Sequence, residues 1–292
     1  MTTAQANGIT IEHDTFGSPH DPALLLVMGF NAQMTAWRDD FCKLLADRGL
    51  FVIRYDNRDC GLSQKFDSAT LDMSALMQAM TNRQPFSDAP YTLSDMAADG
   101  IGLLDHLGIE RAHVLGASMG GMIVHTMAIE HASRLRSVIS VMSTVGDPDY
   151  GQPAPGAMEV LLTPPPTDRE GVIAASVRSK IFQSKRYYDE ELVKAATAAA
   201  YDRSFYPQGA PRQMAAIAAS GDRTEALRSV TTPTLVIHGR DDTLISPTGG
   251  VRTAELIPTA SLLLLADMGH DLPQPLWPVI VDAVVSHTTY AG

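Results

Sequence analysis

The sequence predicts an α/β fold: a mostly parallel, doubly wound sheet with an inserted helical cap. Strand-sized apolar runs alternate with helical stretches along most of the 292 residues, which is typical of a parallel sheet with helices on both faces. A G-x-S-x-G pentapeptide, Gly116 to Gly120, lies between a strand-like run and a helix-like run. After Met142 the strand rhythm stops, and it resumes only at Thr234.

Seven apolar runs are expected to be strands, because each is short and bounded by polar or turn-forming residues. They are residues 8–14, 23–27, 51–55, 112–115, 137–142, 234–238 and 261–265. Residues 94–107 have apolar side chains on one side, polar N-terminal caps and a C-terminal Gly108, so they predict a helix. Residues 120–130 and 278–288 predict two more helices.

The composition changes between the strands predicted at 137–142 and 234–238. Residues 146–166 are dense in Pro and Gly, and helical stretches follow at 167–181, 189–202, 211–219 and 223–229. The first of these begins with Thr167 and Glu170 at capping-box spacing. The chain is therefore divided into a core (1–145), a helical cap (146–230) and the rest of the core (231–292). A short apolar-faced helix is also expected within 67–90, near the cap.

Composition limits the partners. With 33 acidic and 22 basic residues the net charge is −11, which argues against a nucleic-acid partner. No apolar run reaches the ~20 residues that span a bilayer, and no signal peptide is expected at the N-terminus. Cys42 and Cys60 form neither a disulfide framework nor a zinc pattern, and no acidic cluster has metal-ligand spacing. We expect a cytoplasmic protein that needs no metal or cofactor.

The pentapeptide is the candidate for nucleophilic chemistry. Between a strand and a helix, Ser118 lies in a nucleophile elbow, a turn so sharp that Gly116 and Gly120 are needed on either side. A serine attacks an ester at neutral pH only when a base accepts its proton and an acid orients that base. In this architecture the acid and then the base follow the serine along the chain.

Only His270 and His287 follow every plausible acid. His287 falls in the predicted C-terminal helix, where a partly exposed histidine needs no functional explanation. His270 follows the last predicted strand, in a loop at the sheet edge where open α/β sheets bind ligands. His270 is therefore the predicted base.

The acid is expected just after the strand at 234–238. Asp241 and Asp242 are adjacent there, and periodicity does not separate them; either can also serve as a turn former. Asp147 or Asp149, after the strand at 137–142, is a rival. Asp242 is favoured.

On these motifs the chain resembles the α/β-hydrolase fold family, most of all its anthracycline (aclacinomycin-type) methylesterase branch. The segments that carry the resemblance are 24–30, 55–63, 116–120, 239–242, 257–260 and 268–270. The resemblance implies a nucleophile at Ser118, an acid at Asp242, three residues after the glycine, and a base at His270.

Two backbone N–H groups are predicted to form an oxyanion hole. One belongs to Met119, directly after the nucleophile and at a helix start; the other, implied by the resemblance, belongs to Phe30. Met28 stands where the family commonly has histidine. The family's Arg-Gly-x-Gly turn reads Arg58-Asp59-Cys60-Gly61 here.

The predicted activity is hydrolysis of an apolar small-molecule ester through an acyl-enzyme, by a carboxylesterase or methylesterase. C–C bond hydrolases, enol-lactonases and cofactor-free haloperoxidases (perhydrolases) share the triad, and a non-catalytic small-molecule receptor can retain the pocket. Aromatic residues of the cap either line the pocket or pack the cap's own core. They are Phe182, Tyr187, Tyr188, Tyr201, Phe205 and Tyr206.

Overall fold

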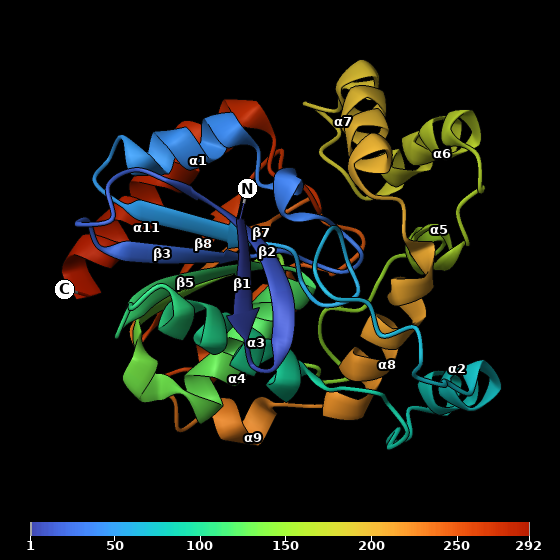
Figure 1. The fold of residues 1–292 in the computed structure, drawn as a ribbon, viewed down its shortest axis with the longest axis horizontal. Helices are drawn as coiled ribbons and strands as arrows, with labels where there is room; N and C mark the ends of the chain where they lie inside the picture. Colours follow the sequence, from blue (N-terminus) through green and yellow to red (C-terminus); the bar gives the residue numbers. More distant parts are fainter. Residues whose placement is uncertain (1, 292) are drawn as a thin grey trace.

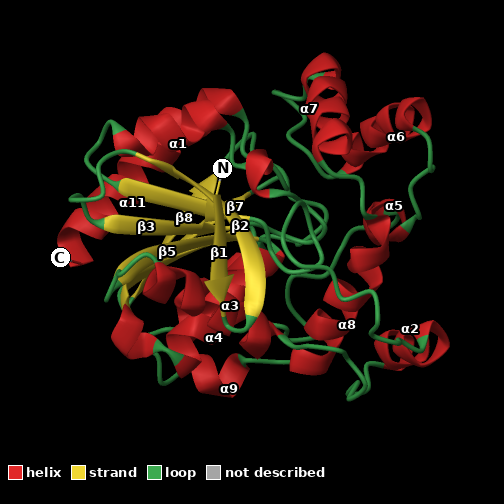
Figure 2. Ribbon diagram, in the orientation of Figure 1, coloured by secondary structure: helices red, strands yellow, loops and turns green. Residues whose placement is uncertain are grey.

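An eight-stranded sheet lies at the centre of the described chain, which is residues 2–291 of a computed structural model (Figures 1 and 2). Its order is β1-β2-β4-β3-β5-β6-β7-β8; β2 is antiparallel to both neighbours and every other pairing is parallel. The strands are β1 Thr2–Ala6, β2 Ile9–Phe16, β3 Ala23–Val27, β4 Phe51–Tyr55, β5 Ala112–Ala117, β6 Leu135–Val141, β7 Thr234–Gly239 and β8 Ala260–Leu265. The predicted fold class is confirmed; Met1 and Gly292, at the ends of the predicted core, lie outside the described residues.

β1 is not among the predicted strands, because its side chains are small or polar and do not form an apolar run. It pairs with β2 through a turn at Asn7 and Gly8, which have φ angles of 49° and 75°. Asn-Gly in this left-handed conformation is a strong hairpin signal. The turn, rather than the strand, is the part of this hairpin that the sequence marks.

Helices cover both faces of the sheet, because alternate residues of each buried strand point to opposite sides. In β3, Leu24 and Leu26 join one apolar cluster, whereas Leu25 and Val27 join the other. The first cluster includes α1 Asp39–Ala46 and α11 Trp277–Ala291, and the second includes α3 Leu93–His106, α4 Met119–Glu130 and α10 Thr248–Leu256. No helix within residues 2–291 has the length and apolar character to cross a membrane.

Between β6 and β7 the structure has helices and loops but no strand. Figure 1 shows α5 to α8 gathered on one side of the sheet. The helices are α5 Ala157–Leu162, α6 Arg169–Ser176, α7 Glu190–Arg203, α8 Ala210–Ser220 and α9 Thr224–Leu227. We call residues 146–230 the cap, and its boundaries remain a prediction.

The start of the cap differs from the prediction in two ways. The capping box expected at Thr167 and Glu170 is wrong: Asp168 is the N-cap and accepts a hydrogen bond from the Gly171 N–H at 2.8 Å. The helix expected to run to residue 181 ends at Ser176 and continues as a 3-10 helix, Val177–Ile181. α5 is not among the predicted helices, because the segment around it is rich in Pro and Gly.

The helix expected within 67–90 is α2 Met73–Asn82, and it lies beside α8 (Figure 1). Leu76 and Ala79 pack against Met214 and Ala215 of α8 in a small apolar cluster. The prediction that this segment lies near the cap is confirmed.

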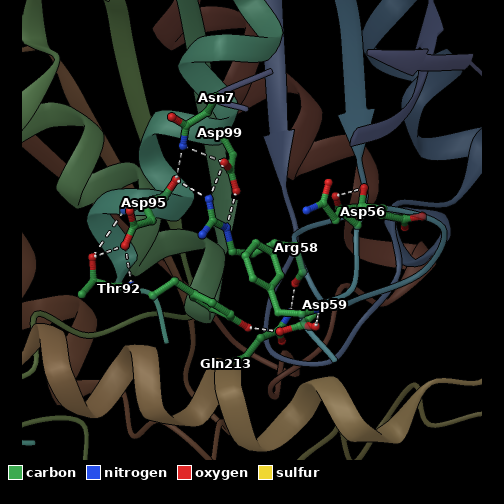
Figure 3. Close-up of polar contacts among 12 residues, drawn as sticks. Asn7, Asp56, Arg58, Asp59, Thr92, Asp95, Asp99 and Gln213 are labelled. Atoms are coloured by element: carbon green, nitrogen blue, oxygen red, sulfur yellow. Dashed lines mark hydrogen bonds and ion pairs between the residues drawn. The ribbon is translucent and has the colours of Figure 1, made fainter. Parts of the chain in front are cut away.

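A buried ion pair links the loop after β4 to α3. The Arg58 guanidinium donates to both oxygens of Asp99 at 2.7 Å, and Asn7 donates to Asp99 at 3.0 Å (Figure 3). The two charged side chains are only 6% and 2% exposed. A buried charge is stable only while its partner compensates it.

We therefore expect Asp99→Ala to lower the free energy of unfolding by about 3–5 kcal/mol, because Arg58 would remain buried without its anion. Urea unfolding followed by circular dichroism measures the change. Asp282→Ala is the control, since it removes the exposed partner of Arg48 and should cost less than about 1 kcal/mol. If both substitutions lowered the free energy of unfolding by the same small amount, Asp99 would not be the compensating anion of a buried Arg58.

Candidate active site

Ser118 lies in a strained turn between β5 and α4, with φ 57° and ψ −120°. A Cβ added at Gly116 would lie 2.0 Å from the Gly120 carbonyl oxygen, and one added at Gly120 would lie 2.1 Å from the Val27 carbonyl oxygen. No side chain fits at either position, so both residues must be glycine. The turn holds the Ser118 side chain above the carboxyl end of the sheet, where it is partly exposed.

The structure brings Ser118, His270 and Asp242 together, although they follow three different strands. The distance from Ser118 Oγ to His270 Nε2 is 2.9 Å, and the distance from His270 Nδ1 to Asp242 Oδ2 is 2.7 Å. A carboxylate can only accept, so the Nδ1–H donates to Asp242 and Nε2 is left to accept from the Ser118 hydroxyl. This is the arrangement that a serine nucleophile requires.

Asp242 is held in place from several sides. Its Oδ1 accepts hydrogen bonds from the N–H groups of Leu244 and Ile245, both at 2.9 Å. Burial raises the pKa of the Asp242 carboxyl, but the His270 and His238 rings outweigh burial and hold it at about 2. The side chain is therefore ionised at neutral pH despite being fully buried.

The other candidate acids and the other late histidine lie elsewhere. Asp147 pairs with Arg252 at 3.3 Å, and Asp149 forms a turn in which its N–H donates to Asp147. Asp241 lies in the turn before Asp242, where its N–H donates to the Met268 carbonyl. His287 lies on α11, which packs against β6.

Within residues 2–291 two further serine–histidine pairs are present, but neither has the surroundings of Ser118. His113 Nδ1 lies 2.8 Å from Ser137 Oγ, and His125 Nε2 lies 2.8 Å from Ser140 Oγ. Burial lowers the pKa of His113 to about 4 and that of His125 to about 3. The Nδ1 of His125 has no partner within residues 2–291. No carboxylate is therefore bonded to this ring to stabilise its protonated form, as Asp242 is to His270.

The loop after β3, residues 28–34, lies against Ser118. A Cβ added at Gly29 would be 3.0 Å from Ser118 Cβ and 3.0 Å from the Ala117 carbonyl oxygen, so the loop approaches closely only because residue 29 is glycine. Neither the Phe30 N–H nor the Met119 N–H has a protein acceptor within residues 2–291. Two free donors therefore flank Ser118, one of them at a helix N-terminus.

Polar residues of the loop after β4, residues 56–63, fix the β3 loop. Asn57 Nδ2 donates to the Met28 carbonyl at 2.8 Å, and Asp56 Oδ1 accepts from the Met34 N–H at 2.7 Å. Sequence reasoning missed these roles. The available signal is a run of polar residues, Asp56 to Asp59, directly after the mostly apolar strand β4, which predicts buried polar contacts rather than solvent exposure.

The loop that carries His270 is bound to the cap. The His270 N–H donates to the Phe182 carbonyl at 2.6 Å, and the Phe182 ring lies edge-on to the imidazole with 6.3 Å between ring centroids. Asp271 accepts from the N–H groups of Ser184 at 3.0 Å and Gly269 at 3.1 Å. The cap thus contacts the loop of His270 directly, through its backbone.

A cleft of about 240 Å³ separates the β3 and β4 loops from α6 and α7. Asn31 and Gln33 line it on the core side, and three of the predicted cap aromatics, Tyr201, Phe205 and Tyr206, line it on the other. Tyr201 and Phe205 stack with ring centroids 4.6 Å apart. The cleft therefore has an aromatic wall, and its lining includes Asn31, the residue after Phe30, but neither Ser118 nor His270.

Residues 22–273 match the α/β hydrolase fold family. The chain is similar to the rhodomycin D methylesterase DauP of Streptomyces sp. (strain C5), with 27% identity over 310 aligned positions that cover 97% of this chain and 96% of that protein. It is also similar to the 2-hydroxymuconate semialdehyde hydrolase of Pseudomonas putida, with 25% identity over 63% of this chain and 64% of the relative. The fold is similar to that of the meta-cleavage product hydrolase CumD of Pseudomonas fluorescens IP01, with a TM-score of 0.78, 20% identity and coverage of 100% and 98%.

Asp271 should make the free energy of unfolding depend on pH. Burial raises the pKa of its carboxyl to about 6, so between pH 4 and 6 the native chain holds a proton that the unfolded chain has released. The free energy of unfolding must then fall as the pH rises through this window. Asp271→Asn should remove this decline, leaving the variant more stable than the wild type by up to about 3 kcal/mol at pH 7.

Urea unfolding at pH 4, 5, 6 and 7 measures the difference between the two proteins. Asp282→Asn, at an exposed carboxylate, should leave the pH dependence unchanged. If the free energies of unfolding of the Asp271 variant and the wild type differ by the same amount at every pH, the pKa of Asp271 is not raised.

Proposed function

Since the chain belongs to the α/β hydrolase fold family, we propose that it is a serine hydrolase that cleaves a carboxylic ester through an acyl-enzyme. The observation that carries the proposal is the pair of hydrogen bonds that joins Ser118, His270 and Asp242, at 2.9 and 2.7 Å. A hydroxyl bonded to a neutral imidazole, whose other nitrogen is bonded to an ionised carboxylate, is prepared to lose its proton as it attacks.

In the acylation step Ser118 Oγ attacks the carbonyl carbon while His270 Nε2 accepts the hydroxyl proton. Asp242 stabilises the imidazolium that forms. The carbonyl oxygen becomes an oxyanion and accepts hydrogen bonds from the N–H groups of Phe30 and Met119. The intermediate then collapses: the bond from carbon to the alcohol oxygen breaks, and His270 gives its proton to the leaving alkoxide.

In the deacylation step water attacks the acyl carbon and His270 Nε2 accepts a proton from it. The same two N–H groups stabilise the second oxyanion. The bond from carbon to Ser118 Oγ then breaks, the carboxylic acid is released, and Ser118 recovers its proton from His270. Every step uses groups of the chain itself and water.

The proposed substrate is an apolar ester, with a methyl ester of a bulky acid as the first candidate. Similarity to a rhodomycin D methylesterase over 97% of the chain supports this choice. The cleft that is lined by Asn31, with its wall of Tyr201, Phe205 and Tyr206, suits a flat apolar group. C–C bond hydrolysis, enol-lactone hydrolysis and perhydrolysis use the same nucleophile and base, so they are the alternatives on this site.

Ser118→Ala should abolish turnover of p-nitrophenyl acyl esters, with a loss of at least about 10⁴-fold in kcat/KM, because the nucleophile is removed. The rate of p-nitrophenolate release measures it, and circular dichroism checks that the fold is intact. Ser140→Ala is the matched control, since Ser140 is also hydrogen-bonded to a histidine but is not at the elbow. Undiminished activity of the Ser118 variant would end the proposal.

An activity panel should distinguish the substrate classes. We expect the methyl esters of bulky aromatic acids to be turned over with higher kcat/KM than p-nitrophenyl esters of graded acyl chain length, because the chain is similar to a rhodomycin D methylesterase over nearly its whole length. Preference for short acyl chains would make the protein a general carboxylesterase. Turnover of a vinylogous diketone or an enol-lactone, with no ester turnover, would favour the alternative hydrolases.

Labelling by an organophosphate separates an enzyme from a receptor. Stoichiometric modification of Ser118 together with rapid ester turnover is the expected result. Modification without any turnover would favour a non-catalytic receptor that retains the pocket.

A further inference from the structure

The β3 loop, which carries Phe30, is held by contacts from two sources. Asn57 and Asp56 bind Met28 and Met34 at its two ends, as described above. At its middle the Asn31 N–H donates to Gln213 Oε1 at 2.8 Å. Gln213 belongs to α8, so the residue directly after Phe30 is fixed by the cap and not by the core.

Gln213 joins the β3 loop to the β4 loop. Its Nε2 donates to the Arg58 carbonyl at 2.8 Å, while its Oε1 accepts from Asn31 (Figure 3 shows Gln213 beneath Arg58 and Asp59). The side chain is 1% exposed, so water does not compete for these two hydrogen bonds. The amide of Gln213 therefore sets the distance between the two loops.

The neighbouring residue fixes the orientation of Gln213. Arg212 binds both carboxylate oxygens of Asp59 at 2.8 Å, in the two-pronged geometry that guanidinium and carboxylate groups prefer. A Cβ added at Gly209 would lie 1.9 Å from the Asp59 carbonyl oxygen, so α8 begins in close contact with the same turn. α8 cannot rotate or slide without breaking these contacts.

Asn31 has a φ of 52°, a left-handed conformation that asparagine tolerates better than most residues other than glycine. The hydrogen bond from Gln213 binds the N–H of this residue. The peptide plane that contains the Asn31 N–H also contains the Phe30 carbonyl and the Phe30 Cα. The Phe30 N–H lies in the preceding plane, which meets this one at that Cα, so a rotation at Asn31 would displace it as well.

We propose that Gln213 is a positioning residue for the oxyanion hole: through Asn31 it holds the Phe30 N–H in the direction that a developing oxyanion requires. The inference rests on the proposed function, since it assigns a purpose to Phe30. Cap helix α8 then serves transition-state stabilisation and not only substrate enclosure. An N–H donor that is misplaced by about 1 Å loses much of its effect.

Gln213→Met tests the proposal, because methionine keeps the volume and helix propensity of glutamine but forms neither hydrogen bond. Ser220→Ala is the matched control: Ser220 also lies on α8 and accepts from the core residue Leu93 at 2.9 Å, but it does not touch the β3 loop. If the methionine variant does not fold, Gln213→Asn, whose amide is one methylene shorter, takes its place.

Two readouts are compared. Hydrogen–deuterium exchange of the amides in residues 28–34 should become about tenfold faster in Gln213→Met, as expected for the loss of one buried hydrogen bond. For p-nitrophenyl acetate, kcat should fall about 10- to 100-fold with little change in KM. For the matching thionoester the fall should be smaller, because sulfur accepts hydrogen bonds weakly. The ratio of the two kcat values is sensitive to the oxyanion hole and insensitive to general damage.

Unchanged exchange in the Gln213 variant overturns the proposal, and so does an equal loss of ester and thionoester turnover. Ser220→Ala should retain the wild-type exchange and the wild-type ratio. Failure of the proposed function is seen separately, as ester turnover that survives Ser118→Ala or is missing in the wild type. In that case the exchange experiment still decides whether Gln213 holds the loop.

Discussion

Two fully buried aspartates, Asp56 and Asp59, are the constraint on which the rest of the structure depends. A carboxylate removed from water is stable only when cations and hydrogen bonds replace its hydration. Both compensating cations come from the cap: Arg203, at the end of α7, pairs with Asp56, and Arg212 pairs with Asp59, each at 2.8 Å. The cap therefore supplies the charges that compensate two buried carboxylates next to the site.

The ion pairs of Asp56 and Asp59 also influence the site, because β3 and β4 are adjacent parallel strands. The carboxyl ends of these strands meet at one edge of the sheet. Fixing the β4 loop fixes its neighbour: Asp56 and Asn57 bind the β3 loop directly, and Gln213 binds both loops at once. On the opposite side the cap binds the His270 N–H through the Phe182 carbonyl. The cap thus contacts the surroundings of Ser118 from both sides, and a movement of the cap changes both.

How far the sequence predicts this protein depends on how local each signal is. The strands at 23–27 and 51–55 agree with the prediction to the residue, because each is a short, mostly apolar run; Arg54 is the one charged residue in the second. The juxtaposition of Ser118, Asp242 and His270 was expected from motif order. The error at Thr167 arose because Asp168, the next residue, is an equally good cap. The hydrogen bond between Gln213 and the β3 loop could not be predicted, since its partner Asn31 lies 182 positions away and a polar residue on a helix is ordinarily exposed.

The turn that departs from the family's Arg-Gly-x-Gly sequence has a physical explanation. Asp59 has a φ of 62°, where glycine would avoid a strain of about 1–3 kcal/mol. Its carboxylate also accepts hydrogen bonds from Tyr91 and the Phe66 N–H, both at 2.8 Å. Glycine would relieve the strain but leave Arg212, 9% exposed, without its anion, and an uncompensated buried charge costs about 3–5 kcal/mol. Asp59 is therefore favoured because Arg212 is present, and the turn that differs from the family is the one that attaches α8.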